Sequence, residues 1–309
     1  MKKTGQEPLT PKTKALLIKS ASYASLATAI ALVGLKAWGW NATDSVSLLS
    51  SLADSVLDVL ASSLTFWAVR FSLSPADAEH RFGHGKSEGL AALCQSVIIA
   101  GSGLYVCFEA LQRFIVPQPI TAPATGIIVI VIATVATSVL VGFQHFVGRR
   151  TGSVAITADA AHYKMDVLIN LGVLIAILMT MWTGWSYADP LVGFGVGLYI
   201  LWNVAGIARR SLDILLDHEI PRSDREQIRS LALGHPDVRG FHDMRTRFGG
   251  NNYIVQFHLE LDPDITLYHS HEILDRVEDR IRKHLPGCEI IIHADPLGYP
   301  ERRDPFEQT

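Results

Sequence analysis

Charged residues are scarce in this sequence, and no sign of charge dominates. Only 18% of the 309 residues are Asp, Glu, Lys or Arg, whereas 49% are hydrophobic and the mean hydropathy is +0.24. So few charges in a chain of this length exclude an ordinary soluble protein. The net charge of −3 gives no basis for binding nucleic acid. The composition therefore predicts a membrane protein with several spans and a smaller soluble part.

The sequence also lacks the cysteine patterns of disulfide scaffolds and thiolate zinc sites. Its three cysteines, Cys94, Cys107 and Cys288, lie far apart and form no CxxC pair. The first two stand in apolar sequence, where we expect small buried side chains. The N-terminal stretch MKKTGQEPLTPKTKALLIKS has no compact apolar core followed by a cleavage site, so we expect no removable signal peptide.

Six apolar segments are each long enough to cross a bilayer as a helix of about 20 residues. They lie near Leu16–Trp38, Val46–Phe71, Leu90–Ile115, Thr121–Phe146, Val154–Trp182 and Pro190–Ile207. After Arg209 charges become frequent, and stretches with the hydrophobic period of a strand alternate with stretches that have the period of a helix. We therefore predict an N-terminal arm at 1–14, a six-helix transmembrane domain at 15–208, a soluble domain at 209–297 and a flexible tail at 298–309.

Basic residues predict the orientation of these spans, because Lys and Arg favour the cytoplasmic side. The arm and every second connection carry them: Lys2, Lys3, Lys12, Lys14, Arg70, Arg81, Lys86, Arg149, Arg150, Arg209 and Arg210. The alternate connections, WGWNATDS, VPQPITAPAT and WTGWSYADP, carry none. Both termini should therefore be cytoplasmic.

The soluble domain is predicted to follow the order α-β-β-α-β. Ser223 and Glu226 have the spacing of a capping box at the start of the first helix. VRGFHDMRTRF and NNYIVQFHLELD flank a Gly-Gly-Asn-Asn turn as a hairpin, and CEIIIHADP forms the last strand. A unit of fewer than about 100 residues has a thin core, which dimerisation would help to stabilise.

Two apolar segments carry acidic and histidine side chains at helical spacing. Asp54 and Asp58 are four residues apart on the second segment, as are His162 and Asp166 on the fifth. A charge at the centre of a membrane helix costs roughly 2.5–3.5 kcal/mol on insertion scales. Three carboxylates and one imidazole form a tetrahedral shell that Zn²⁺ accepts, and the cation would neutralise them. The alternative is a set of hydrogen bonds between helices, for which Ser and Thr are the usual residues. Asp159 is either a helix-start or entrance residue, or a further ligand.

Two further groups of candidate ligands lie outside the apolar segments. The connection SPADAEHRFGHGKSEGL holds Asp77, His80 and His84, with glycines that allow the loop to fold around a metal. In the soluble domain the candidates lie on three strands and one helix, and are His242, His258, His271, His293 and Asp295. Imidazoles on adjacent strands with a carboxylate suit one or two Zn²⁺ ions. Isolated surface histidines are the alternative.

With these residues identified, the chain resembles the cation diffusion facilitator family, in particular its bacterial zinc/iron efflux branch. The motifs are LADSVLD, FGHGKSEGLAAL, ADAAHYKMDV, HDMRTR and IIIHADP, and the resemblance covers about residues 15–297. It implies a homodimer in the bacterial cytoplasmic (inner) membrane, with six membrane helices and a ferredoxin-like, metallochaperone-like α+β domain.

The resemblance also implies roles for the candidate residues. Asp54, Asp58, His162 and Asp166 would form the transport site, the loop residues a second site, and the soluble domain a dinuclear site. Lys86 and Asp217 match a charge pair that interlocks the two protomers. Ala160 and Ala161 stand where relatives have bulkier apolar residues, and Ala294 stands where relatives can have a polar one.

The resulting hypothesis is proton-coupled export of divalent metal ions across the lipid bilayer. Ligands must lose protons to bind Zn²⁺, so protonation expels the metal, and His162 is the expected coupling group. Zn²⁺ is the expected cargo, and Cd²⁺ and Fe²⁺ are expected as further cargoes. Zn²⁺ is also the expected regulatory ion of the soluble domain. A membrane-tethered metal sensor and an intramembrane metallohydrolase are the alternatives, although these spans contain no HExxH motif.

Overall fold

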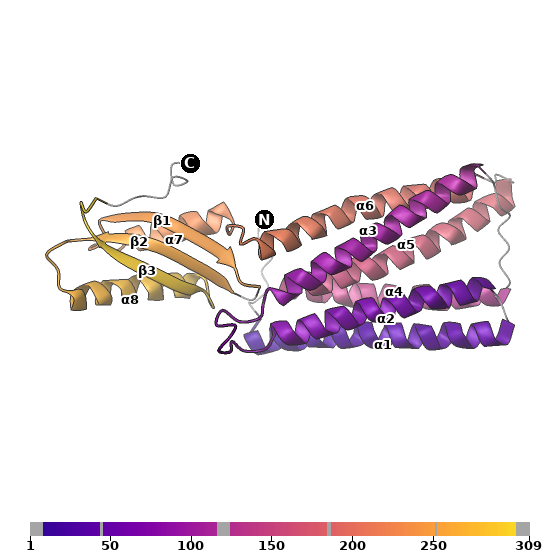
Figure 1. Cartoon of the computed structure of the whole chain (residues 1–309), viewed down its shortest axis with the longest axis horizontal. Coiled ribbons are helices and arrows are strands. Elements are labelled where there is room, and N and C mark those ends of the chain that lie inside the picture. Colours follow the sequence, from indigo (N-terminus) through magenta and orange to yellow (C-terminus); the bar gives the residue numbers. More distant parts are fainter. Residues whose placement is uncertain (1–8, 44–45, 116–123, 184–186, 251, 301–309) are drawn as a thin grey trace. The chain divides into compact units, whose positions relative to one another are not determined.

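The computed structural model describes residues 9–43, 46–115, 124–183, 187–250 and 252–300. The chain forms two compact units (Figure 1). The first comprises residues 1–76 and 87–212, and the second comprises residues 77–86 and 213–309. The break after Leu212 lies close to the change in composition at Arg209. Residues 77–86, which connect two apolar segments in the sequence, belong to the second unit.

The first unit is a bundle of long helices. They are α1 Pro11–Thr43, α2 Val46–Ser72, α3 Ser87–Ile115, α4 Ala124–Thr151, α5 Val154–Thr183 and α6 Ala188–Leu215. Helix α1 packs against α2 and α4, and α5 packs against α4 and α3. Each helix contains the apolar segment predicted for it, except that the first residues of the fourth segment, from Thr121, fall outside the described part of the chain.

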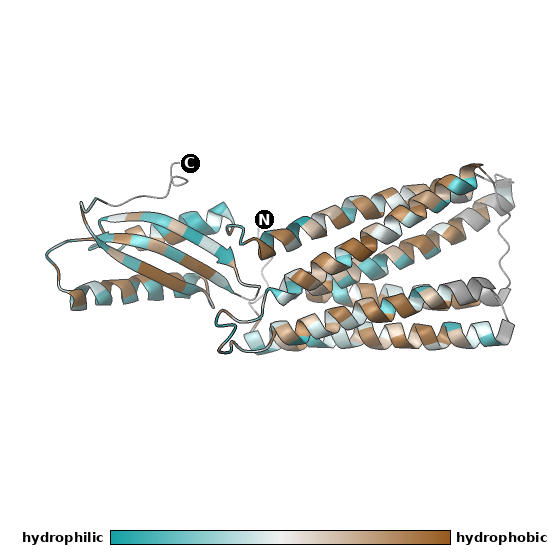
Figure 2. Ribbon diagram, in the orientation of Figure 1, coloured by the Kyte–Doolittle hydropathy of each residue, from teal (hydrophilic) through white to brown (hydrophobic). Residues whose placement is uncertain are grey.

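Five of these helices are long and apolar enough to cross a bilayer: α1, α2, α3, α4 and α6. The helices of the bundle are rich in hydrophobic residues (Figure 2), and polar side chains are buried among apolar ones in its interior. Gln95, Gln144 and Asp159 are fully buried, whereas Leu104, Phe108 and Leu111 are at least half exposed along one face of α3. Such a distribution suits a lipid environment and not water. Helix α5 is not among the five, and it carries Asp159, Lys164 and Asp166.

Small residues bring α3 and α6 together. A Cβ atom on Gly197 would lie 2.5 Å from Cys107 Sγ, and one on Gly193 would contact Ala110. The GFGVG run therefore packs helices closely, as expected for glycines in a membrane span. Cys107 is buried as predicted, but the prediction for Cys94 was wrong, because its side chain is exposed on the outer surface of α3.

The second unit has the predicted α-β-β-α-β order. Its elements are α7 Arg222–Leu233, β1 Gly240–Phe248, β2 Tyr253–Leu261, α8 Leu267–His284 and β3 Glu289–Pro296. Strand β2 is central, antiparallel to β1 and parallel to β3. The core is apolar and includes Ile228, Phe257, Leu259, Ile273 and Val277, all fully buried.

The predicted capping box at the start of α7 is wrong. The N-cap residue is Pro221, two residues before Ser223, and no side chain caps the helix. Glu226 pairs instead with Arg222 at 2.8 Å, an i,i+4 ion pair on an exposed face. The Pro221 carbonyl accepts hydrogen bonds from Asp224 N at 2.9 Å and from Arg225 N at 3.2 Å. Helix α8 does have a cap, since the Thr266 side chain accepts a hydrogen bond from His269 N.

Candidate metal centres

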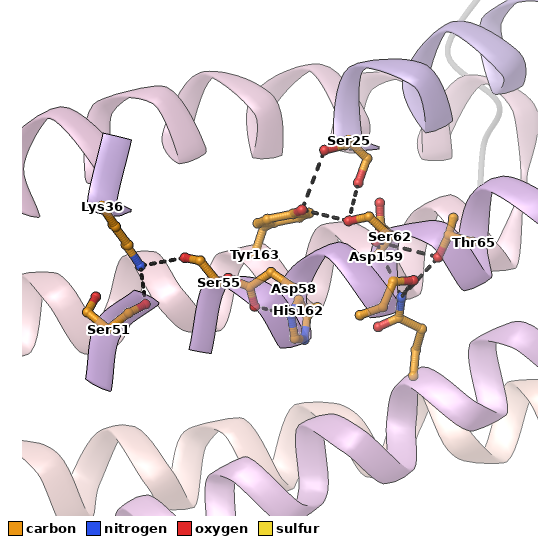
Figure 3. Close-up of polar contacts among 12 residues, drawn as sticks. Ser25, Lys36, Ser51, Ser55, Asp58, Ser62, Thr65, Asp159, His162 and Tyr163 are labelled. Atoms are coloured by element: carbon orange, nitrogen blue, oxygen red, sulfur yellow. Dashed lines mark hydrogen bonds and ion pairs between the residues drawn. The ribbon is translucent and has the colours of Figure 1, made fainter. Parts of the chain in front are cut away.

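Three of the four predicted intramembrane ligands come together between α2 and α5. Asp58, His162 and Asp166 each offer a ligand atom, and these atoms lie within 4.8 Å of one another. His162 Nε2 is 3.0 Å from Asp58 Oδ1, and the imidazole is almost fully buried (Figure 3). His162 Nδ1 is buried too and has no hydrogen-bond partner within the described residues. One imidazole and two carboxylates this close together are donors of the kind that Zn²⁺ accepts.

Asp54, the fourth predicted ligand, lies outside this group and is exposed. A lysine that the sequence analysis did not single out lies next to it. Lys36 Nζ on α1 donates hydrogen bonds to Ser55 Oγ at 2.6 Å and to the Ser51 carbonyl at 3.1 Å. Lys36 also interacts electrostatically with Asp54. The carboxylates of α2 therefore have a cationic neighbour within the bundle.

Hydroxyl groups support His162 from the side of α1 and α2. Ser25 Oγ donates to Ser62 Oγ at 3.0 Å, and Ser62 Oγ lies 2.6 Å from the Tyr163 hydroxyl. The Tyr163 ring meets the His162 ring edge-on, with centroids 5.6 Å apart. Figure 3 shows this chain of hydroxyls running from α1 to α5. It fixes the rotation of α5 about its axis and therefore the direction of His162.

Asp159 is one turn from His162 and is completely buried. Its carboxylate accepts hydrogen bonds from Gln144 Nε2 at 2.6 Å, Gln95 Nε2 at 3.3 Å and Thr65 Oγ1 at 3.5 Å. The donors come from α4, α3 and α2, so this carboxylate links four helices. The alternatives left open by the sequence were a helix-start or entrance residue and a ligand. In the structure Asp159 is a hydrogen-bonded acceptor inside the bundle.

Glu88 caps the helix that carries His162. Its carboxylate accepts hydrogen bonds from Ser153 Oγ at 2.6 Å and Val154 N at 3.1 Å, at the first residues of α5. Ser72 at the end of α2 also donates to it, at 3.4 Å. The side chain is buried. A carboxylate at a helix N-terminus meets the free N–H groups there and the positive end of the helix dipole.

The three predicted loop residues also come together. Asp77 Oδ1 lies 3.2 Å from His80 Nδ1, and Asp77 Oδ2 lies 3.2 Å from His84 Nε2. Gly83 has a φ of 81°, which lets the loop turn so that the two imidazoles lie 4.6 Å apart. The hydrogen bond from His80 N lowers the pKa of Asp77. This carboxylate is therefore held in the charged form that a metal requires.

The strand histidines of the second unit form a row across the sheet. His242 pairs with His258 across β1 and β2, and His258 pairs with His293 across β2 and β3. The row lies on the face opposite the core, because Phe257 and Leu259, on either side of His258, are fully buried in the core. Asp295 Oδ2 lies 2.8 Å from His258 Nδ1 and 3.5 Å from His242 Nε2.

These three residues form the third possible metal-binding group, His242, His258 and Asp295. His293 is adjacent, with Nε2 3.1 Å from Asp295 Oδ1. His271 is not part of the group: it is exposed on α8 and faces Asp275 at 3.7 Å. Glu260, which the sequence analysis did not single out, lies 3.3 Å from His242 Nδ1. Two imidazoles with a carboxylate fit a resident Zn²⁺ ion.

The remaining predicted pair, Lys86 and Asp217, forms an ion pair of 2.8 Å within one chain. Arg247 also reaches Asp217, at 3.3 Å, and its guanidinium lies over the Phe82 ring. Partial burial raises the pKa of Asp217, but Lys86 and Arg247 outweigh it and hold the pKa below its ordinary value. These contacts attach residues 77–86 to the rest of the second unit.

The functional residues that sequence reasoning missed share one signal. Lys36, Gln95, Gln144 and Glu88 are strongly polar side chains within or at the start of otherwise apolar helices. The cost of placing such groups in lipid means that each needs a partner. The sequence shows the group but not which helix supplies that partner.

Two family models together match most of the chain. Residues 22–216 match the family model described as cation efflux transmembrane domain, and residues 220–297 match cation efflux protein, cytoplasmic domain. The chain is 42% identical over 280 residues to the cation-efflux pump FieF of Klebsiella pneumoniae, covering 91% of this chain and 93% of that protein. FieF of Salmonella choleraesuis is 42% identical over 287 residues, covering 93% and 95%.

Two solved structures each match about a quarter of this chain. One is the metal-bound C-terminal domain of the CzcD transporter from Thermotoga maritima, 23% identical, with a TM-score of 0.25, covering 26% of this chain and all of that one. The other is the zinc form of the transporter CzrB, 27% identical, with a TM-score of 0.25, covering 28% of this chain and 99% of that one.

Proposed function

This chain belongs to the cation efflux family, the cation diffusion facilitators, and we propose that it exports Zn²⁺ from the cytoplasm in exchange for protons. Membership makes it an integral membrane transporter of metal ions and not a catalytic enzyme. Cd²⁺ and Fe²⁺ are proposed as further cargoes. The donor set supports Zn²⁺ over a harder cation such as Mn²⁺, because the site includes an imidazole.

The observation that carries the proposal is the group of Asp58, His162 and Asp166 inside an apolar bundle. Two partly buried carboxylates on facing helices repel each other, and a divalent cation removes that repulsion. Asp54 is proposed as the fourth ligand. It lies one turn away on α2, so a small rotation or shift of that helix would bring its carboxylate to the cation. Such a movement is expected when the site opens alternately to the two sides.

Proton exchange follows from the chemistry of the ligands. Imidazole binds a metal only when one ring nitrogen is free of a proton, and carboxylates bind as anions. Protons that reach the site from the outer side would therefore compete with the cation and favour its release. An unperturbed imidazole titrates near neutral pH, so His162 is proposed as the coupling group.

The proposed membrane placement uses all six long helices. Helix α5 carries His162 and Asp166, and we propose that it spans the bilayer with the other five. The basic residues between α2 and α3, in the last turn of α4 and near the end of α6 support cytoplasmic termini. The membrane is proposed to be the bacterial inner membrane.

The second unit is proposed to bind resident Zn²⁺ and to hold a homodimer together. The His242, His258 and Asp295 group supports one ion, and His293 with Asp295 supports a second. A bound ion would supply positive charge that draws strands or subunits together. His271 is exposed on α8, which packs on the opposite face of the sheet from the row, so a site on the partner subunit is the proposed recipient. Asp77, His80 and His84 are proposed as a further site.

Two other functions were considered for the same residues. A membrane-tethered sensor would bind metal through the second unit and move none across the membrane. A metallohydrolase would need a general base beside an open metal position. Asp159, the buried acid nearest the site, is held by three donors, which favours a structural role for it.

Transport into sealed vesicles tests the proposal. Purified full-length protein in vesicles with an outward-directed proton gradient should drive Zn²⁺ uptake, and Zn²⁺ should in turn move protons. Asp58→Ala should abolish uptake while leaving the folded protein intact. Ser63→Ala is the matched control, because its hydroxyl bonds only to Val59 of its own helix. Uptake by the Asp58 variant at the unsubstituted rate would refute the site, and zinc binding without uptake would support the sensor.

A further inference from the structure

A cavity in the first unit is lined by none of the proposed metal ligands. It has a volume of about 440 Å³ and lies between α4, α5 and α6, with Ile99 of α3 at its floor. Deeper in the bundle its walls are apolar and include Met165, Leu168, Ile200 and Val204. Ala160 and Ala161, noted in the sequence as smaller than expected, also line it. The small side chains leave room in a part of the bundle that would otherwise be filled.

The open end of this cavity is basic. Arg149, in the last turn of α4, and Arg210, near the end of α6, both line it and are exposed. His145 lies one turn deeper on α4, and Lys164 lies deeper still, where its ammonium donates to the Tyr199 hydroxyl at 2.8 Å. Among the described residues that line the cavity there is no Asp or Glu. Neither arginine forms an ion pair with another described residue.

This charge distribution argues against a route for the exported cation. A divalent metal would meet two guanidinium groups and an ammonium before it reached the bundle interior. The same distribution suits an anion with an apolar tail. Basic pockets between membrane helices at the cytoplasmic side bind anionic lipid headgroups. A volume of this size holds a headgroup and part of one chain.

We propose that the cavity binds one anionic phospholipid of the cytoplasmic leaflet. Its phosphate lies between Arg149 and Arg210, and an acyl chain lies along Met165, Ile200 and Val204. The lipid would bridge α4 and α6 and lie against α5, the helix that carries His162 and Asp166. The proposal rests on the proposed orientation of the helices but not on the identity of the cargo.

Lipid retention by the full-length protein tests this site. Protein purified in detergent is titrated with phosphatidylglycerol or phosphatidylcholine, and bound lipid is counted by native mass spectrometry. We expect one phosphatidylglycerol per chain to bind in preference to phosphatidylcholine. The double variant Arg149→Gln/Arg210→Gln should weaken its binding by roughly thirtyfold, the effect of two basic side chains beside an anionic lipid surface. Arg209→Gln is the matched control, because Arg209 is equally exposed but does not line the cavity.

A second variant separates the headgroup from the chain. Val204→Phe fills the apolar part and leaves both arginines, so it should also reduce retention of phosphatidylglycerol. Equal binding of the two lipids, or unchanged binding by both variants, would overturn the proposal. Displacement by glycerol phosphate at the same concentration as the lipid would identify a site for soluble anions and would also overturn it. Zinc uptake by the same variants in sealed vesicles is measured separately, so failure of the lipid site and failure of transport are distinguishable.

Discussion

At the scale of single residues, the intramembrane site depends on charges that lie outside its ligand group. Lys36 is held against α2 by Ser51 and Ser55, next to Asp54. Its ammonium would repel a cation in the proposed site and would offer the carboxylates an alternative partner when the cation leaves. We therefore expect Lys36 to favour release over tight binding.

Lys36→Met should therefore strengthen metal binding and slow turnover. Loss of one positive charge near a divalent ion lowers the KM for Zn²⁺ by about tenfold, with a matching fall in maximal rate. Zinc uptake into vesicles over a range of concentrations measures both. Lys19→Met removes an exposed lysine from the N-terminal half of the same helix and should change neither. An unchanged or higher KM in the Lys36 variant would show that this ammonium does not act on the site.

Asp217 gives a pH dependence outside the membrane. Because Lys86 and Arg247 hold its pKa below the ordinary value, its charged form stabilises the fold. That stabilisation is complete above the unfolded carboxyl pKa of about 3.9 and is lost as pH falls through the lower folded pKa. It is below about 1 kcal/mol, since Asp217 and Lys86 are both more than a third exposed.

Asp217→Asn should accordingly lower the melting temperature at pH 7 and pH 5 by the same small amount, and by less below about pH 4. Asn is a suitable replacement because Asp217 has a φ of 57°, which Asn also tolerates. Thermal unfolding of the two proteins across this pH range measures the difference. A gap that widens as the pH falls would contradict the assigned shift.

The ligand group was predictable from the sequence as far as helical spacing determines it. Spacing of four residues places His162 and Asp166 on one face of α5, and the same rule places Asp54 beside Asp58. It does not determine the depth of one helix relative to another. Asp54 and Asp58 are four residues apart, which is a rise of about 6 Å along α2. Because α5 meets α2 at the level of Asp58, Asp54 lies one turn away from the group. Side chains that join helices, such as Gln95 and Gln144, were unpredictable for the same reason.

At the scale of elements, helix α5 is fixed at its start by a residue from α3. Glu88 accepts hydrogen bonds from Ser153 and Val154, and it follows closely after the loop that contains Asp77, His80 and His84. The position of α5, and with it His162, is therefore linked to the chain just after that loop. The sequence shows Glu88 only as an acid near the start of an apolar segment.

Glu88→Ala should destabilise the protein by about 1–3 kcal/mol, because it leaves a buried hydroxyl and a buried N–H without an acceptor. The melting temperature of the full-length protein in detergent measures the change. Glu79→Ala removes an exposed carboxylate from the preceding loop and is the control. Zinc uptake should fall with the Glu88 change even at temperatures where the protein stays folded, since α5 carries two of the ligands. Equal melting temperatures for both variants would rule out the capping role.

The strands of the second unit were easier to predict than its helices. Alternation of apolar and polar residues fixes which face of β2 carries His258, and pairing then aligns His242 and His293 with it. Helix α8 packs on the opposite face through Ile273 and Val277. An exposed residue on α8, such as His271, cannot reach the row in its own chain. The spacing of histidines along the sequence does not reveal this separation.

At the scale of the whole molecule, two units with opposite surfaces share one chain. The first has polar groups inside and apolar side chains outside, and the second has an apolar core under a polar surface. Composition alone predicts this division, because the change in charge content after Arg209 is large. It does not predict that residues 77–86 belong to the second unit, since that contact depends on Asp217 and Arg247, far away in the sequence.

The second unit has a core of its own, from Ile220 to Ile290, so residues 210–309 should form a soluble domain when expressed alone. We expect this domain to bind Zn²⁺ and to dimerise more tightly with it. Metal that binds the dimer preferentially stabilises it by RT ln(1 + [L]/Kd), about 2.7 kcal/mol at a hundred times Kd. Sedimentation with and without Zn²⁺ measures this change in dimerisation.

The double variant His258→Ala/Asp295→Ala should abolish the effect of Zn²⁺ on dimerisation, because these two residues lie at the centre of the row. His284→Ala, an exposed histidine at the end of α8, is the control. In the full-length protein the double variant should slow zinc uptake without abolishing it, since the intramembrane ligands remain. If zinc leaves the sedimentation of the isolated domain unchanged, the row of histidines does not control assembly.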